Sequence, residues 1–584
     1  MYILGISAYY HDSAAALLKD GIIIAAVQEE RLSRIKNDRS FPNLAIDACI
    51  NIAGIKLDEI DSIIFYEKPF WKFERIFESI TQNVPFSFLQ FLKAIPLWVK
   101  KRLWIGPEIK DKLHFKGRVL YASHHQSHAA AAFYASGFTS SAILILDGVG
   151  EYATSSIATG EGCLIKMLKE QHFPHSLGLL YSAFTQYCGF KVNSGEYKLM
   201  GLAAYGQPRF KQLIYNHLIQ QFPDGSYSLD MTYFHYNEGL KLINKKFTRL
   251  FGRDQRGEQD GLDVFYFDVA ASIQAVLEEI VLKLLEQVKS VTNASKLVFS
   301  GGVALNCKLN QRIVESGLFE QYYFHSNPGD AGCAAGAAYL GYYDFLQKSI
   351  VTSKSTVFLG NTPYTSDGFG WMQSELNMLG VPYKIISDHH DDIPIALASG
   401  KIIASLNGRM EFGPRALGHR SILADPRDPE MKGMLNRKIK LREGFRPFAP
   451  SILEEHVEAL FDLGPANYDT MMITATAKAG TAELMPSAIH VDGSARLHIV
   501  SRHVDKAFHD IIHRFYLMTG CPALINTSFN IRGEPIVATV QDALHTFLYT
   551  DIDILLLENK FLISKSMELN AVKAKIKPKV IPND

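Results

Sequence analysis

The sequence lacks the features that mark several common classes of protein. Its 584 residues include only six cysteines, with no Cys-x-x-Cys pair, so neither a disulfide framework nor a thiolate zinc site is indicated. The 60 basic residues equal the 60 acidic ones, which argues against a nucleic-acid partner. No apolar run approaches the roughly 20 residues that span a bilayer. The first residues, MYILGISAYYHDS, do not resemble a signal peptide. We therefore expect a cytoplasmic protein without a membrane span.

The residues that are present suit a large globular α/β protein. Hydrophobic residues make up 47% of the chain, and its length predicts two to four lobes. The opening stretches predict three short strands, YILGIS, AAALLK and IIIAAVQEE, and a fourth strand, SIIFYE, follows a helical pattern. Such a strand meander is how actin-like ATPase lobes begin. The alternation predicts a sheet covered by helices, and two similar lobes are expected, each opening on a turn with Gly and Asp.

The periodic pattern weakens once along the chain. Residues 351–379 are polar and turn-forming, which predicts a linker between two domains. We expect a first domain over residues 1–350 and a second over residues 380–584, with its own strand and helix signals.

One stretch differs from the otherwise ordinary surface. Residues 83–107 are rich in aromatic side chains and include the basic triplet KKR. This composition suits a membrane surface or a hydrophobic partner. The alternative, which we favour from the sequence, is a lid or an inter-lobe helix that packs on the body.

Three histidines open the stretch HHQSHAAAAFYASG. On a helix, His124 and His128 lie one turn apart on the same face, whereas His125 points about 100° away. Asp147 and Asp330 each follow a strand, in turns that contain glycine. Two imidazoles and two carboxylates suit iron(II), manganese or zinc. The alternative is a helix start whose histidines form hydrogen bonds in a polar core.

Two glycine turns are candidates for nucleotide binding. Gly301 and Gly302, in FSGGVALN with Asn306, follow a strand and precede a helix, so their N–H groups could face a phosphate. Gly148 and Gly150 form a second turn of this kind. Two such turns suggest a nucleotide cleft, although both could be plain connections.

A histidine also lies in the first turn of the chain. His11 and Asp12 stand between two predicted strands. The imidazole could deprotonate an acceptor hydroxyl, and Asp12 could orient it or help to bind a cation. An ordinary polar connection explains the pair equally well.

The second domain has cations in unusual surroundings. Arg415, Lys440 and Arg496 lie among glycine, proline and aromatic residues rather than along a charged helix face. This context favours recognition of a fixed anion such as a phosphate, with Asn526 and Ser528 completing the hydrogen bonds. For each arginine alone, a salt bridge is the simpler explanation.

Taken together, the motifs resemble a known family. The following stretches occur in order over nearly the whole chain: AYYHDSAAAL, QEERLSRIKNDRSFP, HHQSHAA, LDGVGE, GEYKLMGLAAYG, SGGVALN, NPGDAG, FGPRALGHRSILADPR, REGFRPFAP and NTSFNIRGEP. They closely resemble the O-carbamoyltransferase family of the nodulation, cephamycin and aminoglycoside tailoring enzymes. The resemblance implies an actin-like, two-lobed N-terminal domain and a YrdC-like α/β C-terminal domain.

The resemblance also implies a two-step reaction. The C-terminal domain would form carbamoyl-adenylate from carbamoyl phosphate and ATP, with Mg²⁺, and Arg415, Lys440, Arg496, Asn526 and Ser528 would hold carbamoyl phosphate. The N-terminal domain would move the carbamoyl group to a small hydroxyl-bearing acceptor, with His11 as base. The implied ligands of iron(II), or of another divalent ion, are His124, His128, Asp147 and Asp330.

Several alternatives stay open at this point. A transferase that modifies tRNA with threonylcarbamoyl is disfavoured by the zero net charge. An actin-like ATP-binding scaffold that transfers no group is a third hypothesis. The sequence allows a homodimer and does not rank the acceptors.

Overall fold

The computed structural model describes residues 1–84, 87–236, 241–348, 356–364, 368–387 and 391–577. The chain divides into two compact units. The N-terminal unit comprises residues 1–26 and 39–355, and the C-terminal unit comprises residues 27–38 and 356–584. None of the helices formed by the described residues combines the length and the apolar character that crossing a bilayer requires.

The N-terminal unit contains two five-stranded sheets of the same topology. The first has the order β3-β2-β1-β4-β5, in which β1 pairs antiparallel with β2 and parallel with β4. The second has the order β12-β11-β6-β7-β8, in which β6 pairs antiparallel with β7 and parallel with β11. This duplication confirms the predicted actin-like fold with two lobes. The strands are β1 (Tyr2–Ser7), β2 (Ala14–Lys19), β3 (Ile22–Gln28), β4 (Ser62–Phe65), β5 (Arg118–Tyr121), β6 (Ser140–Leu146), β7 (Ala153–Glu161), β8 (Leu164–His172), β11 (Lys296–Ser300) and β12 (Gln321–Phe324).

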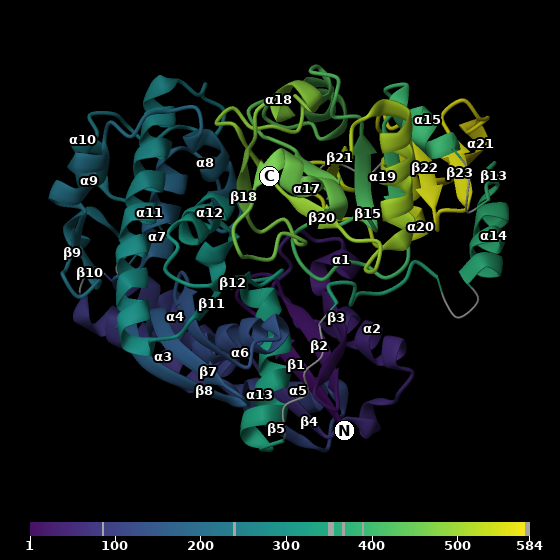
Figure 1. Cartoon of the computed structure of the whole chain (residues 1–584). Coiled ribbons are helices and arrows are strands. Elements are labelled where there is room, and N and C mark those ends of the chain that lie inside the picture. The colour runs from purple at the N-terminus through teal and green to yellow at the C-terminus, as the bar shows by residue number, and fades with distance from the viewer. Residues whose placement is uncertain (85–86, 237–240, 349–355, 365–367, 388–390, 578–584) are drawn as a thin grey trace. The chain divides into compact units, whose positions relative to one another are not determined.

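The long helix α11 (Val264–Thr292) packs against four shorter helices, α7, α8, α9 and α12 (Figure 1). The other elements of the unit are α2 (Asn43–Ala53), α3 (Pro69–Gln82), α4 (Phe88–Lys100), α5 (Ile105–Leu113), α6 (His124–Ser136), α7 (Leu177–Tyr187), α8 (Glu196–Ala203), α9 (Lys211–His217), β9 (Ile219–Gln221), β10 (Tyr227–Leu229), α10 (Lys245–Leu250), α12 (Cys307–Glu315) and α13 (Cys333–Leu340).

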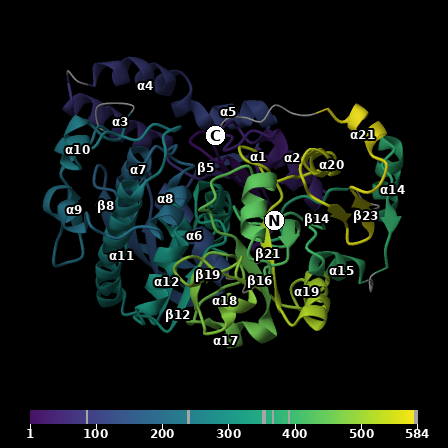
Figure 2. The ribbon, with the colours of Figure 1, turned by 90° about the horizontal axis from the view of Figure 1, so that it is seen from above.

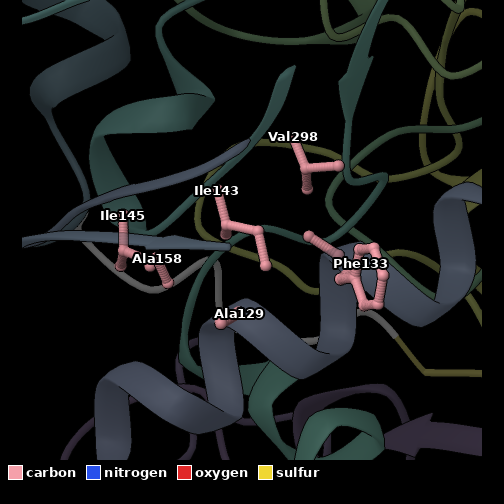
Figure 3. Close-up of a cluster of buried hydrophobic side chains, with 7 residues drawn as sticks. Ala129, Phe133, Ile143, Ile145, Ala158 and Val298 are labelled. Carbon is pink, nitrogen blue, oxygen red and sulfur yellow. The ribbon is translucent and has the colours of Figure 1, made fainter. Parts of the chain in front are cut away.

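Small residues let α6 lie close to the second sheet and to α13. Ala129 and Phe133 of α6 pack on Ile143 and Val298 of the sheet (Figure 3). On the other side, a Cβ atom added to Gly336 of α13 would lie 1.8 Å from the carbonyl oxygen of Ser127 in α6. Only glycine fits at this crossing. The small residues of α6 and α13 therefore permit close packing of these helices.

The C-terminal unit has a mixed sheet in which most neighbouring strands are antiparallel. Its order is β13-β23-β22-β14-β15-β21-β16-β20, and a three-stranded sheet β17-β18-β19 accompanies it. The strands are β13 (Lys384–Ile385), β14 (Ile403–Leu406), β15 (Arg420–Ala424), β16 (Ala449–Leu453), β17 (Phe461–Asp462), β18 (Thr474–Ala477), β19 (Ser494–Arg496), β20 (His498–Val500), β21 (Ala523–Ser528), β22 (Ile554–Leu557) and β23 (Phe561–Ser564). The helices are α14 (Gly368–Leu379), α15 (Asp392–Ala398), α16 (Met431–Met434), α17 (Val457–Leu460), α18 (Thr481–Leu484), α19 (Lys506–Thr519), α20 (Val540–Leu548) and α21 (Asn570–Lys575).

A short segment near the N-terminus belongs to this C-terminal unit. The predicted strand over residues 22–30 ends at Gln28, and Glu29 begins the helix α1 (Glu29–Ser33), where two glutamates favour the helix N-terminus. The buried Arg31 donates a hydrogen bond to the carbonyl of Gly413 (2.7 Å), and Arg34 donates to the carbonyl of Ile536 (2.6 Å). The predicted domains, residues 1–350 and 380–584, do not include the assignment of residues 27–38 to the C-terminal unit.

The predicted linker over residues 351–379 contains the point at which the units divide, between residues 355 and 356. Its last part forms α14 (Gly368–Leu379) of the C-terminal unit. Residues 351–355 and 365–367 lie outside the described residues.

Candidate functional site

Helix α6 presents two histidines to one point in the N-terminal unit. It begins directly after Ser123, and the side chains of its first residue, His124, and of His128, one turn later, are both buried. The Nε2 atoms of His124 and His128 lie 3.1 Å apart. His125 instead places its Nδ1 atom 2.6 Å from the hydroxyl of Ser156. The structure thus separates the pair from the third histidine, as the helical spacing predicts.

Two aspartates from strand ends complete a cluster of four. Asp147 follows β6, and its carboxylate lies 3.2 Å from Nε2 of His124. Asp330, which follows β12, lies 3.7 Å from Nε2 of both His124 and His128. One ligand atom from each residue lies within 4.8 Å of the others, and all four residues are buried. These donors therefore fit a single divalent ion, although ion binding itself stays a prediction.

The two buried carboxylates of this cluster favour a positive charge beside them. Burial opposes ionisation of Asp147, but the hydrogen bond from His124 and the nearby imidazoles outweigh burial and hold its pKa well below the usual range. Burial likewise lowers the pKa of His124, but Asp330 and Asp147 outweigh it and raise that pKa to about 9. The two carboxylates thus favour the protonated form of His124. A divalent ion would compete with that proton for the same nitrogen.

Cys333 also lies within reach of the two histidines. Burial, followed by the charge of Asp330, raises the pKa of its thiol well above the usual value. Because the thiolate is the form that binds metals, the protonated thiol is a poor ligand. The carboxylates are therefore the better partners for the histidine pair.

His11 stands beside the cluster, in the turn after β1. Its Nδ1 atom lies 3.0 Å from the carboxylate of Asp12, and its Nε2 atom lies 3.8 Å from that of Asp330. Burial lowers the pKa of His11, but Asp330 and Asp12 outweigh it and raise the pKa to about 9. A cation on Asp330 would weaken this effect and bring the imidazole nearer to the range of a general base.

The two glycine turns lie against residues of the same cluster. The N–H of Gly302 donates to the carboxylate of Asp147 (3.1 Å), so in this structure it is engaged within the protein. A Cβ atom added to Gly301, at φ +94°, would lie 2.2 Å from the carbonyl oxygen of Leu146. One added to Gly150 would lie 3.0 Å from the His124 ring. Gly301 is therefore needed for close packing, and a side chain at position 150 would press on the His124 ring.

The other two predicted nucleotide contacts differ from each other. The side chain of Asn306 accepts from the N–H of Leu309 at the start of α12 and exchanges two hydrogen bonds with Gln274. Asn306 therefore has a structural role here. A Cβ atom on Gly148 would meet nothing within 4 Å. That turn is open on its side-chain side.

A second group of polar residues gathers around the end of β21 in the C-terminal unit. The buried ammonium of Lys440 donates to the carbonyl and hydroxyl of Ser528 (2.7 and 3.1 Å) and to the carbonyl and side chain of Asn530 (2.9 and 2.8 Å). Burial holds the pKa of Lys440 well below its usual value, and Arg442, Arg446 and Lys36 lower it further. Such a concentration of positive charge attracts a polyanion.

Asn526 links the rest of this group to the same strand. Its amide donates to the carbonyl of Ala416, next to Arg415, and to the hydroxyl of Ser451. Ser451 pairs in register with His498, two residues after Arg496 at the end of β19. The backbone thus brings the segments of Arg415 and Arg496 to the strand that carries Asn526 and Ser528.

Three residues of these sites were missed from the sequence alone. Glu151 accepts the backbone N–H of His124 with both carboxylate oxygens (3.0 and 3.1 Å). Asn530 accepts from Lys440, and Lys36 reaches the same neighbourhood from the α1 segment. Glu151 and Asn530 stand in quoted motifs, LDGVGE and NTSFNIRGEP, and this was the available signal. Lys36 also stands in such a motif, QEERLSRIKNDRSFP, although no local pattern connects it to a site about 400 residues away.

The chain matches known families and proteins over most of its length. The family described as "Carbamoyltransferase N-terminus" matches residues 2–339, and "Carbamoyltransferase C-terminus" matches residues 395–565. The chain is 43% identical to the uncharacterized protein sll1178 of Synechocystis sp. over 97% of each chain. It is 36% identical to nodulation protein NolNO of Sinorhizobium fredii over 96% of this chain and 80% of that relative.

Among solved structures, HypF from T. kodakarensis is 15% identical, with a TM-score of 0.31 over 60% of this chain and 49% of that chain. This likeness is too low to carry an argument, so the fold assignment rests on the sheet topology. The family matches cover more than half of the chain, and they include both the histidine–aspartate cluster and Lys440. The chain therefore belongs to the carbamoyltransferase family and is a carbamoyltransferase enzyme.

Proposed function

We propose that the enzyme is an ATP-dependent O-carbamoyltransferase that uses carbamoyl phosphate and a small hydroxyl-bearing acceptor, either a natural product or a sugar. In the C-terminal unit, water releases carbamate and phosphate from carbamoyl phosphate. The carbamate oxygen then attacks the α-phosphorus of ATP, which gives carbamoyl-adenylate and pyrophosphate. In the N-terminal unit, the acceptor oxygen attacks the carbonyl carbon, AMP leaves, and the hydroxyl proton passes to His11.

The observation that carries this proposal is the environment of Lys440. Its ammonium is held by four acceptors, and the charges of Arg442, Arg446 and Lys36 act on it. A site with this much positive charge suits two phosphorylated substrates together. In the proposal, carbamoyl phosphate is held by Arg415, Lys440, Arg496, Asn526 and Ser528, and Mg²⁺ accompanies ATP.

The N-terminal unit supplies the residues for transfer. Asp12 holds Nδ1 of His11, which leaves Nε2 directed toward Asp330 and the acceptor. A divalent ion, iron(II) in our proposal, would be held by His124, His128, Asp147 and Asp330 and would supply a Lewis acid for the carbamoyl group or its phosphate. The candidate contacts of the nucleotide remain Gly148, Gly150, Gly301, Gly302 and Asn306.

The products formed without an acceptor test the first step. Incubation of the enzyme with ATP, Mg²⁺ and carbamoyl phosphate should yield AMP and pyrophosphate, both of which chromatography and ³¹P NMR detect. Omission of carbamoyl phosphate should stop their formation. ADP as the product, or ATP hydrolysis that ignores carbamoyl phosphate, would overturn the proposal, and the second result would favour an ATP-binding scaffold.

A further inference from the structure

Helix α4 is apolar yet lies at the surface of the N-terminal unit. None of the 13 residues of α4 (Phe88–Lys100), all of which the structure describes, is buried. Its sequence, FLQFLKAIPLWVK, would normally belong to a helix of the core. The large exposed side chains are those of Phe88, Leu89, Phe91, Leu92, Leu97 and Val99. Figure 2 shows α4 next to α3 at the edge of the N-terminal unit.

The inner side of α4 accounts for its attachment. The ring of Trp98 lies 6.2 Å from that of Phe73 in α3, measured between centroids. At the same, C-terminal end of α4, the indole N–H of Trp104 donates to the carbonyl of Val99 (2.8 Å). These contacts hold the helix on its Trp98 side and leave the opposite side in solvent. The expectation of a helix packed on the body is therefore met on one face only.

The exposed face combines apolar and basic side chains. Leu89, Leu92, Pro96 and Val99 follow one another at spacings of three or four residues, so they share one face of the helix. We call these four residues the α4 face. Lys93 follows Leu89 by four residues and Lys100 follows Pro96 by four, which places both along one edge of this face. Lys101, also exposed, follows directly after the helix, and residues 87–107 contain no aspartate or glutamate.

We propose that the α4 face docks on an anionic lipid surface. The apolar side chains would enter the boundary between headgroups and acyl chains, while Lys93, Lys100 and Lys101 would lie against the lipid phosphates. Charge decides against a second copy of the chain as the occupant. In a two-fold interface the same patch meets itself, so the lysines of both copies would repel each other with no acidic residue in the segment to offset them.

Sedimentation of the full-length protein with vesicles tests this proposal. Binding should be strong to vesicles of phosphatidylcholine with phosphatidylglycerol and at least about tenfold weaker to phosphatidylcholine alone. The variant K93Q/K100Q/K101Q should bind the anionic vesicles on the order of a hundredfold more weakly, at roughly fivefold for each charge lost. Equal binding to both vesicle types, or no binding at all, would overturn the proposal.

A matched pair of variants tests the apolar contribution. L89E/L92E should abolish binding to the anionic vesicles, whereas L517E should retain it, because Leu517 lies in α19 and not in the α4 face. Leu517 is a matched control because its side chain is 70% exposed and that of Leu89 is 71% exposed. Neither Leu89 nor Leu92 is buried, so the midpoint of thermal unfolding should not change and will show that the variant folds. Retained binding by L89E/L92E would contradict the proposal. The proposal would also be contradicted if the wild-type protein did not bind vesicles and L89E/L92E converted a dimer into a monomer, as measured by light scattering. That result would assign the α4 face to a second copy of the chain.

Discussion

At the scale of residues, the chemistry of the N-terminal unit is set by two buried carboxylates that need positive charge. Asp147 and Asp330 lie against His124, His128 and His11 at 3.2 to 3.8 Å. A proton on an imidazole supplies this positive charge, but the protonated nitrogen can no longer bind a metal ion. A divalent ion supplies the charge without that proton, because it binds neutral imidazole and ionised carboxylate together.

Metal content checks this account residue by residue. Enzyme purified without oxygen should hold about one divalent ion per chain, because the four side chains form one site. Asp330→Ala should lose the ion, since it removes a carboxylate that approaches both histidines. His125→Gln is the matched control and should keep the ion, because His125 faces Ser156. An active wild-type enzyme without metal, or loss of the ion in both variants, would refute the ligand assignment.

Part of the site could be predicted from the sequence, residue by residue. Helical spacing selects His124 and His128 over His125, and strand-end turns single out Asp147 and Asp330, because both signals are local. The role of Glu151 depends on a backbone N–H that lies 27 residues earlier in the chain, and no periodicity reveals such a contact. In the same way, the four acceptors around Lys440 come from a strand end 88 and 90 residues away.

At the scale of elements, the position of the histidines depends on how closely α6 and α13 cross. Ser127 lies between His124 and His128 in the sequence, and its carbonyl faces Gly336. The backbone oxygen cannot rotate away as a side chain could. Any side chain at position 336 must therefore push α6, and its two histidines, away from α13.

Gly336→Ala tests this dependence. A Cβ atom at 1.8 Å from the Ser127 oxygen forces the helices apart, which should destabilise the unit by about 1 to 3 kcal/mol and lower Tm by several degrees. Metal content should fall as well, because the ligands move with α6. Gly261→Ala provides the control, since a Cβ atom there meets nothing within 4 Å. An unchanged Tm and metal content in Gly336→Ala would show that the crossing does not position the site.

Some elements could be predicted and others could not. The strands Tyr2–Ser7 and Ala14–Lys19 coincide with the predicted ones because buried apolar runs between turn residues are local signals. The third predicted strand continues two residues too far, since Glu29 and Glu30 stand in the first turn of α1. Their helical state is supported by contacts of Arg31 and Arg34 with residues 382 and 502 positions away, which local patterns do not encode.

At the scale of the whole molecule, two units alternate along the chain, and each carries one of the two candidate sites. Residues 27–38, which begin with the last two residues of β3, belong to the C-terminal unit, where Lys36 contributes to the potential around Lys440. The metal-type cluster stays entirely in the N-terminal unit. We therefore predict that substitutions in one unit can disable one chemical step and leave the other intact.

Pyrophosphate exchange into ATP, driven by carbamoyl phosphate, tests this separation most directly. Lys440→Met should reduce exchange by at least about a hundredfold, because it removes the ammonium from the anion site. His124→Ala should leave exchange close to the wild-type rate while it stops transfer to an acceptor. If His124→Ala abolished exchange as completely as Lys440→Met, the assignment of the two steps to different units would be wrong.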